Sequence, residues 1–185
     1  MITLPFVSQT DIDAALRVLE RRCATVSPDN IRVSVNGMPV HFSARVYYAT
    51  EDVQAACRAA GIASQIALCL GSRHNDGYVR EQCLQRLLLA EAPWMVPFVL
   101  QLLGEYVVEI STVIDGFLAE CIPARYMEFA NENPGHMHRL HQQATSYWNE
   151  YYRRAYPNRH EYPALRALQR LADGAATLGV AIPRR

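Results

Sequence analysis

Hydrophobic residues near the start of the chain recur at the spacing of one face of a helix. Thr10 precedes the acidic residues Asp11 and Asp13, an arrangement that favours a helix N-terminus. Apolar residues follow at helical spacing, at Ile12, Leu16, Leu19 and Cys23. The pattern predicts a first helix over about residues 10–24, ended by the Ser-Pro-Asp-Asn sequence at 27–30.

A different spacing follows, because polar and apolar residues alternate on both sides of Asn36-Gly37. This dipeptide favours a two-residue type I′ turn, in which both residues take positive φ. If the turn closes there, three cross-strand pairs place their apolar side chains on one face: Val35 with Met38, Val33 with Val40, and Ile31 with Phe42. The sequence therefore predicts a β-hairpin at about 31–48, which must pack on helices because a lone hairpin is only marginally stable.

Helical spacing returns after the hairpin and continues through most of the chain. Helices are expected over 50–70 with a break at Gly61, through Val79–Leu87, over Trp94–Leu118, around 125–130, over 135–155 and after Pro163. The predicted fold class is mainly α, a multi-helix array or bundle with an N-terminal hairpin. At 185 residues we expect one globular domain, in which residues 1–49 pack on the helical region 50–185.

Charge excludes some classes of partner. Lys+Arg and Asp+Glu both number 18, so no net field attracts phosphates or an anionic membrane, and nucleic acid is not an expected partner. The most apolar stretch is interrupted by Glu105, Glu109 and Asp115, so no membrane span is expected. The chain start lacks the features of a secretory signal, and we expect a cytoplasmic protein.

Cysteine usage indicates neither a disulfide framework nor a zinc knuckle. The five cysteines are odd in number and scattered, and no two form a CxxC pair. We interpret them as reduced thiols buried in helices. Cys69, Ser72 and His74 lie close together in sequence, but nothing around them resembles a nucleophile elbow.

One segment carries a family resemblance. Residues Asp76 to Leu87 combine an acidic turn, Val79-Arg80 and leucines at helical spacing, and they resemble the first helix of a HEAT-type repeat, with Cys83 where that family usually has Ala. The segment Val96–Leu103 is similar to the second helix, and Glu105–Glu109 to the start of another unit, with Glu109 in place of Arg. HEAT proteins bind partners along a helical face. The resemblance, over about residues 72–118, implies protein binding and brings no catalytic residues.

Two groups of side chains suggest an alternative, a small metal-dependent hydrolase. Gln101, Glu105, Glu109 and Thr112 form one polar stripe if residues 94–118 are a single helix, and two carboxylates a turn apart are suited to a divalent cation. The other interpretation is a solvated helix face. His138 and His141 share a helix face and complete the alternative site, whereas His136 points away. No cofactor is expected otherwise.

Aromatic and arginine residues concentrate between residues 147 and 162. Tyr, Trp and Arg dominate binding hot spots because they bury a large area at little entropic cost. We expect Tyr147, Trp148 and Tyr151 in the core and five residues on a binding surface: Tyr152, Arg153, Tyr156, Arg159 and Tyr162. The sequence therefore favours an α-helical interaction module or adaptor over an enzyme, and we expect it to bind another protein or itself as a homo-oligomer.

Overall fold

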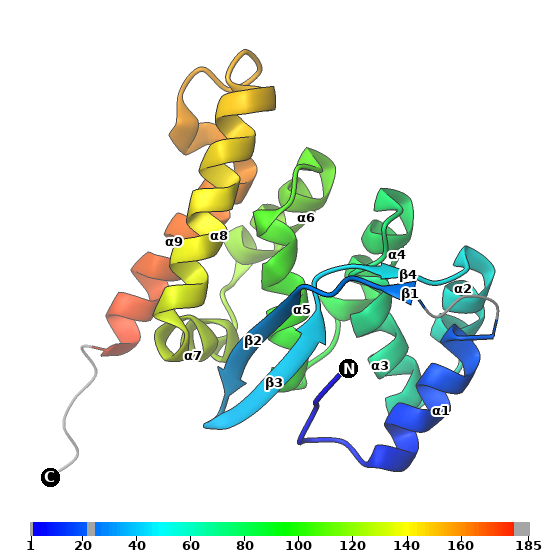
Figure 1. Cartoon of the computed structure of the whole chain (residues 1–185). Helices are drawn as coiled ribbons and strands as arrows, with labels where there is room; N and C mark the ends of the chain where they lie inside the picture. The colour runs from blue at the N-terminus through cyan, green and yellow to red at the C-terminus, as the bar shows by residue number, and fades with distance from the viewer. Residues whose placement is uncertain (1, 22–24, 180–185) are drawn as a thin grey trace, which may run out of the picture. The chain divides into compact units, whose positions relative to one another are not determined.

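The computed structural model of the protein describes residues 2–21 and 25–179 and is mainly α-helical, which confirms the predicted fold class (Figure 1). Contacts within the chain define two compact units, Met1–Val99 and Leu100–Arg185. The single domain expected from chain length stays a prediction.

The first helix of unit 1, α1 (Gln9–Leu19), is shorter than predicted and begins earlier. Its N-cap is Ser8 and not Thr10, because the Ser8 hydroxyl accepts a hydrogen bond from the Asp11 backbone N–H at 3.1 Å. Ile12 and Leu19 are buried as the helical spacing predicted. Cys23, the last residue of that predicted apolar row, lies outside the described residues.

The predicted hairpin is confirmed in position and register. Strands β2 (Asn30–Val35) and β3 (Met38–Ser43) pair antiparallel with Val35 opposite Met38, Val33 opposite Val40 and Ile31 opposite Phe42. The turn residues Asn36 and Gly37 have φ of 51° and 78°, as a type I′ turn requires. Its buried face packs through Phe42, whose ring stacks on Phe98 with centroids 4.1 Å apart. Strands β1 (Thr25–Val26) and β4 (Val46–Tyr47) form a second short pair.

Unit 1 continues with the helices α2 (Thr50–Arg58), α3 (Ile62–Gly71) and α4 (Gly77–Leu87). The predicted break at Gly61 separates α2 from α3, and its φ of 82° with ψ of −170° is a conformation that only glycine adopts readily. Helix α3 packs against α1, α2 and α4, so it forms the centre of this helical cluster (Figure 1).

The turn between α3 and α4 is joined to the end of the hairpin by buried hydrogen bonds. His74 accepts the Asp76 backbone N–H on Nδ1 at 3.1 Å, so its Nε2 carries the proton that is donated to the Tyr48 carbonyl at 2.8 Å. Arg73 donates to the Ala44 carbonyl at 2.9 Å. The Ser72 hydroxyl donates to the Cys69 carbonyl at 2.7 Å. Ser72 and His74 therefore hold the backbone together and do not form a nucleophile–base pair.

The single helix predicted over Trp94–Leu118 is wrong. The chain there forms η1 (Pro93–Met95), α5 (Val96–Gln101), η2 (Leu102–Gly104) and α6 (Val108–Glu120). Glu105 is extended, with φ of −116° and ψ of 165°, and this conformation ends the helical run. Gly104 lies so close to a neighbouring helix that a Cβ would be 2.8 Å from Leu140 Cδ2. The break therefore lies beside a closely packed glycine, and apolar spacing alone does not reveal it.

The remaining helices of unit 2 are α7 (Ala124–Glu132), α8 (Pro134–Tyr147) and α9 (Pro163–Gly179). Helix α9 packs against α6, α7 and α8, and its predicted row Leu165, Leu168 and Leu171 is buried (Figure 1). A π-helical turn, η3 (Trp148–Tyr152), and the short η4 (Arg159–Glu161) connect α8 to α9. None of the helices in the described part of the chain has the length and apolar character needed to cross a bilayer.

Candidate functional site

The π-helical turn Trp148–Tyr152 changes which aromatic residues face the core. A π turn has i→i+5 hydrogen bonds and inserts an extra residue into the helical register, so the residues beyond it rotate relative to a regular α-helix. Tyr151, predicted for the core, is instead 64% exposed. Tyr152, on the next position, is half-buried.

Four tyrosines from two parts of unit 2 form a continuous surface through ring contacts. The Tyr147 ring lies 6.2 Å from that of Tyr106 and 6.2 Å from that of Tyr151. Tyr151 also contacts Tyr152 edge to face at 6.5 Å. Tyr106, in the loop before α6, is 52% exposed. We call this set the tyrosine surface: Tyr106, Tyr147, Tyr151 and Tyr152.

The tyrosine surface rests on a buried tyrosine. Tyr162 was expected to be exposed, and this expectation is wrong, because its exposed fraction is 0%. Its ring stacks on Tyr152 with centroids 5.3 Å apart and meets Tyr156 edge to face at 5.7 Å. Burial, followed by the nearby Tyr152 hydroxyl, raises the pKa of Tyr162 well above its usual range. Burial also raises the pKa of Tyr152, so both hydroxyls stay protonated near neutral pH.

Hydrogen bonds and a cation–π contact fix the chain around these rings. The Tyr152 hydroxyl donates to the backbone carbonyl of Tyr106, which ties the π turn to the loop before α6. The Trp148 indole N–H donates to the Tyr156 carbonyl at 2.8 Å. Arg153 lies over the Trp148 ring at 5.4 Å and also donates to the Asn149 side chain. The rings are therefore held in place by contacts within unit 2.

Charged side chains of both signs flank the rings. Arg153 and Arg159 are exposed, as predicted, and Tyr156 is half-buried. Glu150 and Glu161 are exposed on the same connection between α8 and α9. The surroundings of the rings therefore carry charges of both signs.

The side chains predicted for the alternative metal site do not form one polar stripe. Glu105 is buried in the turn before α6, whereas Glu109 is exposed in the first turn of α6. The stripe prediction is wrong because it needed one helix across residues 101–112. Among residues 2–21 and 25–179, no three His, Cys, Asp or Glu side chains are grouped as a metal ion would require.

The two predicted histidines lie on α8, where both are exposed. His141 lines a groove of about 410 Å³ between α7, α8 and α9, whose other walls include Leu168, Ala172 and Ala176. Burial lowers the pKa of His141, and the charges of Arg159 and His138 add to that effect. Among the described residues, the other side chains that line the groove are mostly apolar.

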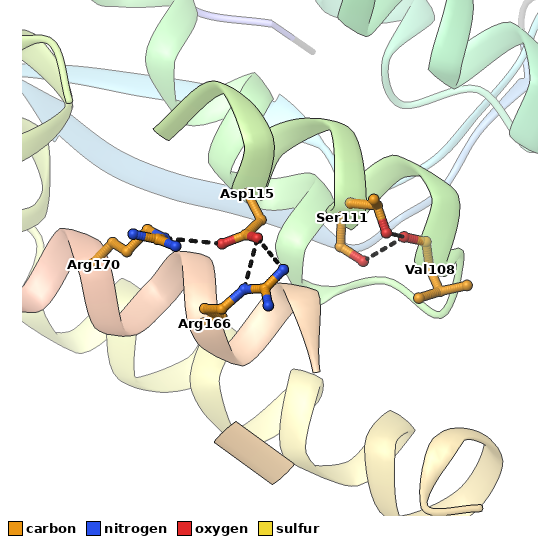
Figure 2. Close-up of polar contacts among 6 residues, drawn as sticks. Val108, Ser111, Asp115, Arg166 and Arg170 are labelled. Atoms are coloured by element: carbon orange, nitrogen blue, oxygen red, sulfur yellow. Dashed lines mark hydrogen bonds and ion pairs between the residues drawn. The ribbon is translucent and has the colours of Figure 1, made fainter. Parts of the chain in front are cut away.

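Sequence reasoning missed a buried ionic cluster. Figure 2 shows the Asp115 carboxylate of α6 between two arginines of α9. Arg166 donates to one oxygen through Nε at 2.7 Å, and Arg170 Nε donates to the other at 3.1 Å. The Asp115 side chain is 4% exposed, whereas those of Arg166 and Arg170 are 44% and 38% exposed. The cluster joins two packed helices, and we interpret it as structural.

No family model, curated protein or solved structure matches this chain. The resemblance to a HEAT-type repeat therefore stays a prediction. The boundary between the two compact units, after Val99, falls inside the segment that carries it.

Proposed function

We propose that this chain is a protein-interaction module and that the tyrosine surface binds a second protein chain, either a different protein or another copy. One observation carries the proposal: Tyr106 and Tyr151, both more than half exposed, are linked through the ring of Tyr147 into one aromatic surface. Large exposed aromatic side chains in a contiguous group are typical of interaction sites.

The supporting contacts reduce the entropic cost of binding. Tyrosine has two side-chain torsions, and these rings are further restrained by ring contacts and by the hydrogen bond from Tyr152 to Tyr106. Phenolic hydroxyls at the rim of such a surface can donate to a partner's backbone or carboxylates. A π-helical turn, often found at functional sites, carries part of the surface.

A protein partner fits the surroundings better than nucleic acid does. The chain has no net charge, and exposed glutamates as well as exposed arginines lie on the connection that carries the rings. Binding to a phosphate backbone would weaken steeply with added salt, because counterions are released on association. We expect binding through the tyrosine surface to change little with salt.

Affinity capture with the full chain tests the proposal. Bait proteins carrying Tyr151→Ser or Tyr106→Ser are compared with wild type and with Tyr78→Ser, a control at a 79% exposed tyrosine of α4 in unit 1. Lysate of the source cells is used with and without nuclease treatment, and light scattering of each purified bait measures self-association. We expect either one captured protein or the self-associated form to be lost in both test variants and retained in the control.

Equal capture and equal mass for all four proteins would contradict the proposal. Steep loss of binding with salt, or loss after nuclease treatment, would assign the surface to nucleic acid instead.

A further inference from the structure

Two cysteine thiols face each other between helices of unit 1. Cys57 of α2 and Cys83 of α4 have their sulfur atoms 3.9 Å apart. Gly71, at the end of α3, makes room for them, because a Cβ there would lie 2.5 Å from the Cys83 sulfur. The sulfurs of a disulfide are about 2.05 Å apart, so side-chain rotation has to bring these two sulfur atoms closer by roughly 2 Å.

Both thiols line the same surface pocket. The pocket has a volume of about 320 Å³, and its wall includes Val53, Leu68, Val79 and the two cysteines. Arg58, Arg86 and Gln82 lie at its exposed rim. A small solute therefore reaches the thiol pair without unfolding of the helices. Cys69, the third buried cysteine nearby, is not part of this wall.

The two thiols differ in their surroundings, and this difference gives each one a role. The hydrogen bond with Cys83 lowers the pKa of Cys57, and the charge of Arg86 acts in the same direction. Arg86 is held there by a hydrogen bond to the Cys57 carbonyl oxygen. The contact with Cys57 and burial both raise the pKa of Cys83 well above its usual range. Because Arg86 is held at the Cys57 carbonyl and places its positive charge there, Cys57 is assigned as the attacking thiol and Cys83 as the resolving thiol.

We propose that Cys57 and Cys83 form a peroxide-oxidisable dithiol, a modification site that links α2 to α4 when oxidised. The Cys57 thiolate attacks one oxygen of a small hydroperoxide, whose O–O bond breaks to give a Cys57 sulfenic acid and an alkoxide, or hydroxide from hydrogen peroxide. That anion takes up the proton that Cys57 had released. Cys83 sulfur then attacks the Cys57 sulfur, a disulfide forms and water leaves with the Cys83 proton. The dithiol loses two electrons and the hydroperoxide gains them.

The full-length protein, reduced and then freed of reductant, is treated with hydrogen peroxide, and the remaining thiols are alkylated after unfolding. Cleavage after arginine places each of the five cysteines on a different peptide, so every pairing is distinguishable by mass. We expect peptides 46–58 and 81–86 to become linked within one chain, independently of protein concentration. Reductant should restore both thiols.

Variants assign the roles. Cys83→Ser should leave a sulfenic acid at residue 57 that dimedone captures, whereas Cys57→Ser should leave Cys83 unreacted. Cys69→Ser serves as the matched control at a buried cysteine of α3 and should preserve the link. Circular dichroism checks that each variant is folded. The peptide map of the wild-type protein tests the link between Cys57 and Cys83 without any variant. Oxidation of exposed Cys121 while Cys57 and Cys83 stay alkylatable, or a link from Cys57 to Cys69, would overturn the proposal.

Discussion

Tyr152 stacks on Tyr162 with ring centroids 5.3 Å apart and ring planes inclined by 23°, although one ring reaches the surface and the other is fully buried. This contact connects the tyrosine surface to the core of unit 2. The Tyr152 ring is therefore restrained by a packed interior side chain, which lowers the entropic cost of ordering it on binding.

Stability should fall at alkaline pH because of buried tyrosines. Burial raises the pKa of Tyr48 to about 12 and that of Tyr162 well above its usual range. A tyrosine whose pKa is higher in the folded protein than in the unfolded chain stabilises the fold while its hydroxyl is protonated. This contribution is complete below the unfolded pKa of about 10 and is lost as the pH rises above that value. We expect the free energy of unfolding to fall by about 1.4 kcal/mol per pH unit for each of these tyrosines between about pH 10 and 12.

Urea denaturation across that range measures the effect. Tyr162→Phe removes one of the two groups and should make the decline clearly shallower, whereas Tyr151→Phe, at an exposed ring, should leave it unchanged. Equal slopes for all three proteins would show that Tyr162 is not the titrating group.

Neutralising Asp115 should weaken the contact between α6 and α9. Asp115→Asn keeps the shape of the side chain but removes the charge that Arg166 and Arg170 share. Because both arginines are partly exposed and screened by water, we expect a loss of about 1–2 kcal/mol in the free energy of unfolding. Asp173→Asn, at an exposed carboxylate of α9, is the matched control and should change stability by less than about 0.5 kcal/mol. Similar losses for both variants would refute the structural role of the cluster.

Two glycines should respond to alanine in opposite directions. Neither Gly61 nor Gly116 has a neighbour that an added Cβ would touch, so only backbone conformation distinguishes them. Gly61→Ala forces a side chain into a region that suits glycine alone, and we expect a loss of about 1–3 kcal/mol. Gly116→Ala lies within α6 and should gain about 0.5–1 kcal/mol, because alanine loses less entropy in a helix. Thermal unfolding of both variants checks the signs, and a stabilised Gly61→Ala protein would contradict the assigned conformation.

Local chemistry explains what the sequence predicted correctly. The register of the hairpin follows from the positive φ of Asn36 and Gly37, which two adjacent residues specify by themselves. The break at Gly61 is likewise a backbone preference of one residue. The mainly α fold class follows from the helical spacing of apolar residues, a pattern that recurs at many positions along the chain.

Contacts between distant residues explain what the sequence did not predict. The helical run ends where Glu105 becomes extended, next to Gly104, which packs closely against Leu140 of α8. Tyr151 lies within a π turn and is exposed, whereas Tyr162 is buried, and the spacing of apolar residues in the sequence does not reveal a π turn. Asp115 finds its arginines on α9, about fifty positions later in the chain, which only the folded structure brings together. The aromatic region and its exposed arginines were predicted, whereas the exposures of Tyr151 and Tyr162 were predicted the wrong way round.

Site-specific photo-crosslinking tests the tyrosine surface most directly. A photoreactive phenylalanine derivative replaces Tyr151 in the full chain expressed in its source cells, and a matched protein carries it at Tyr78, which is 79% exposed in unit 1. We predict that the derivative at 151 crosslinks to one defined protein, or to a second copy of the chain, at several times the yield obtained at 78. Equal yields at the two positions, or products spread over many proteins from both, would contradict the assignment of this surface as a binding site.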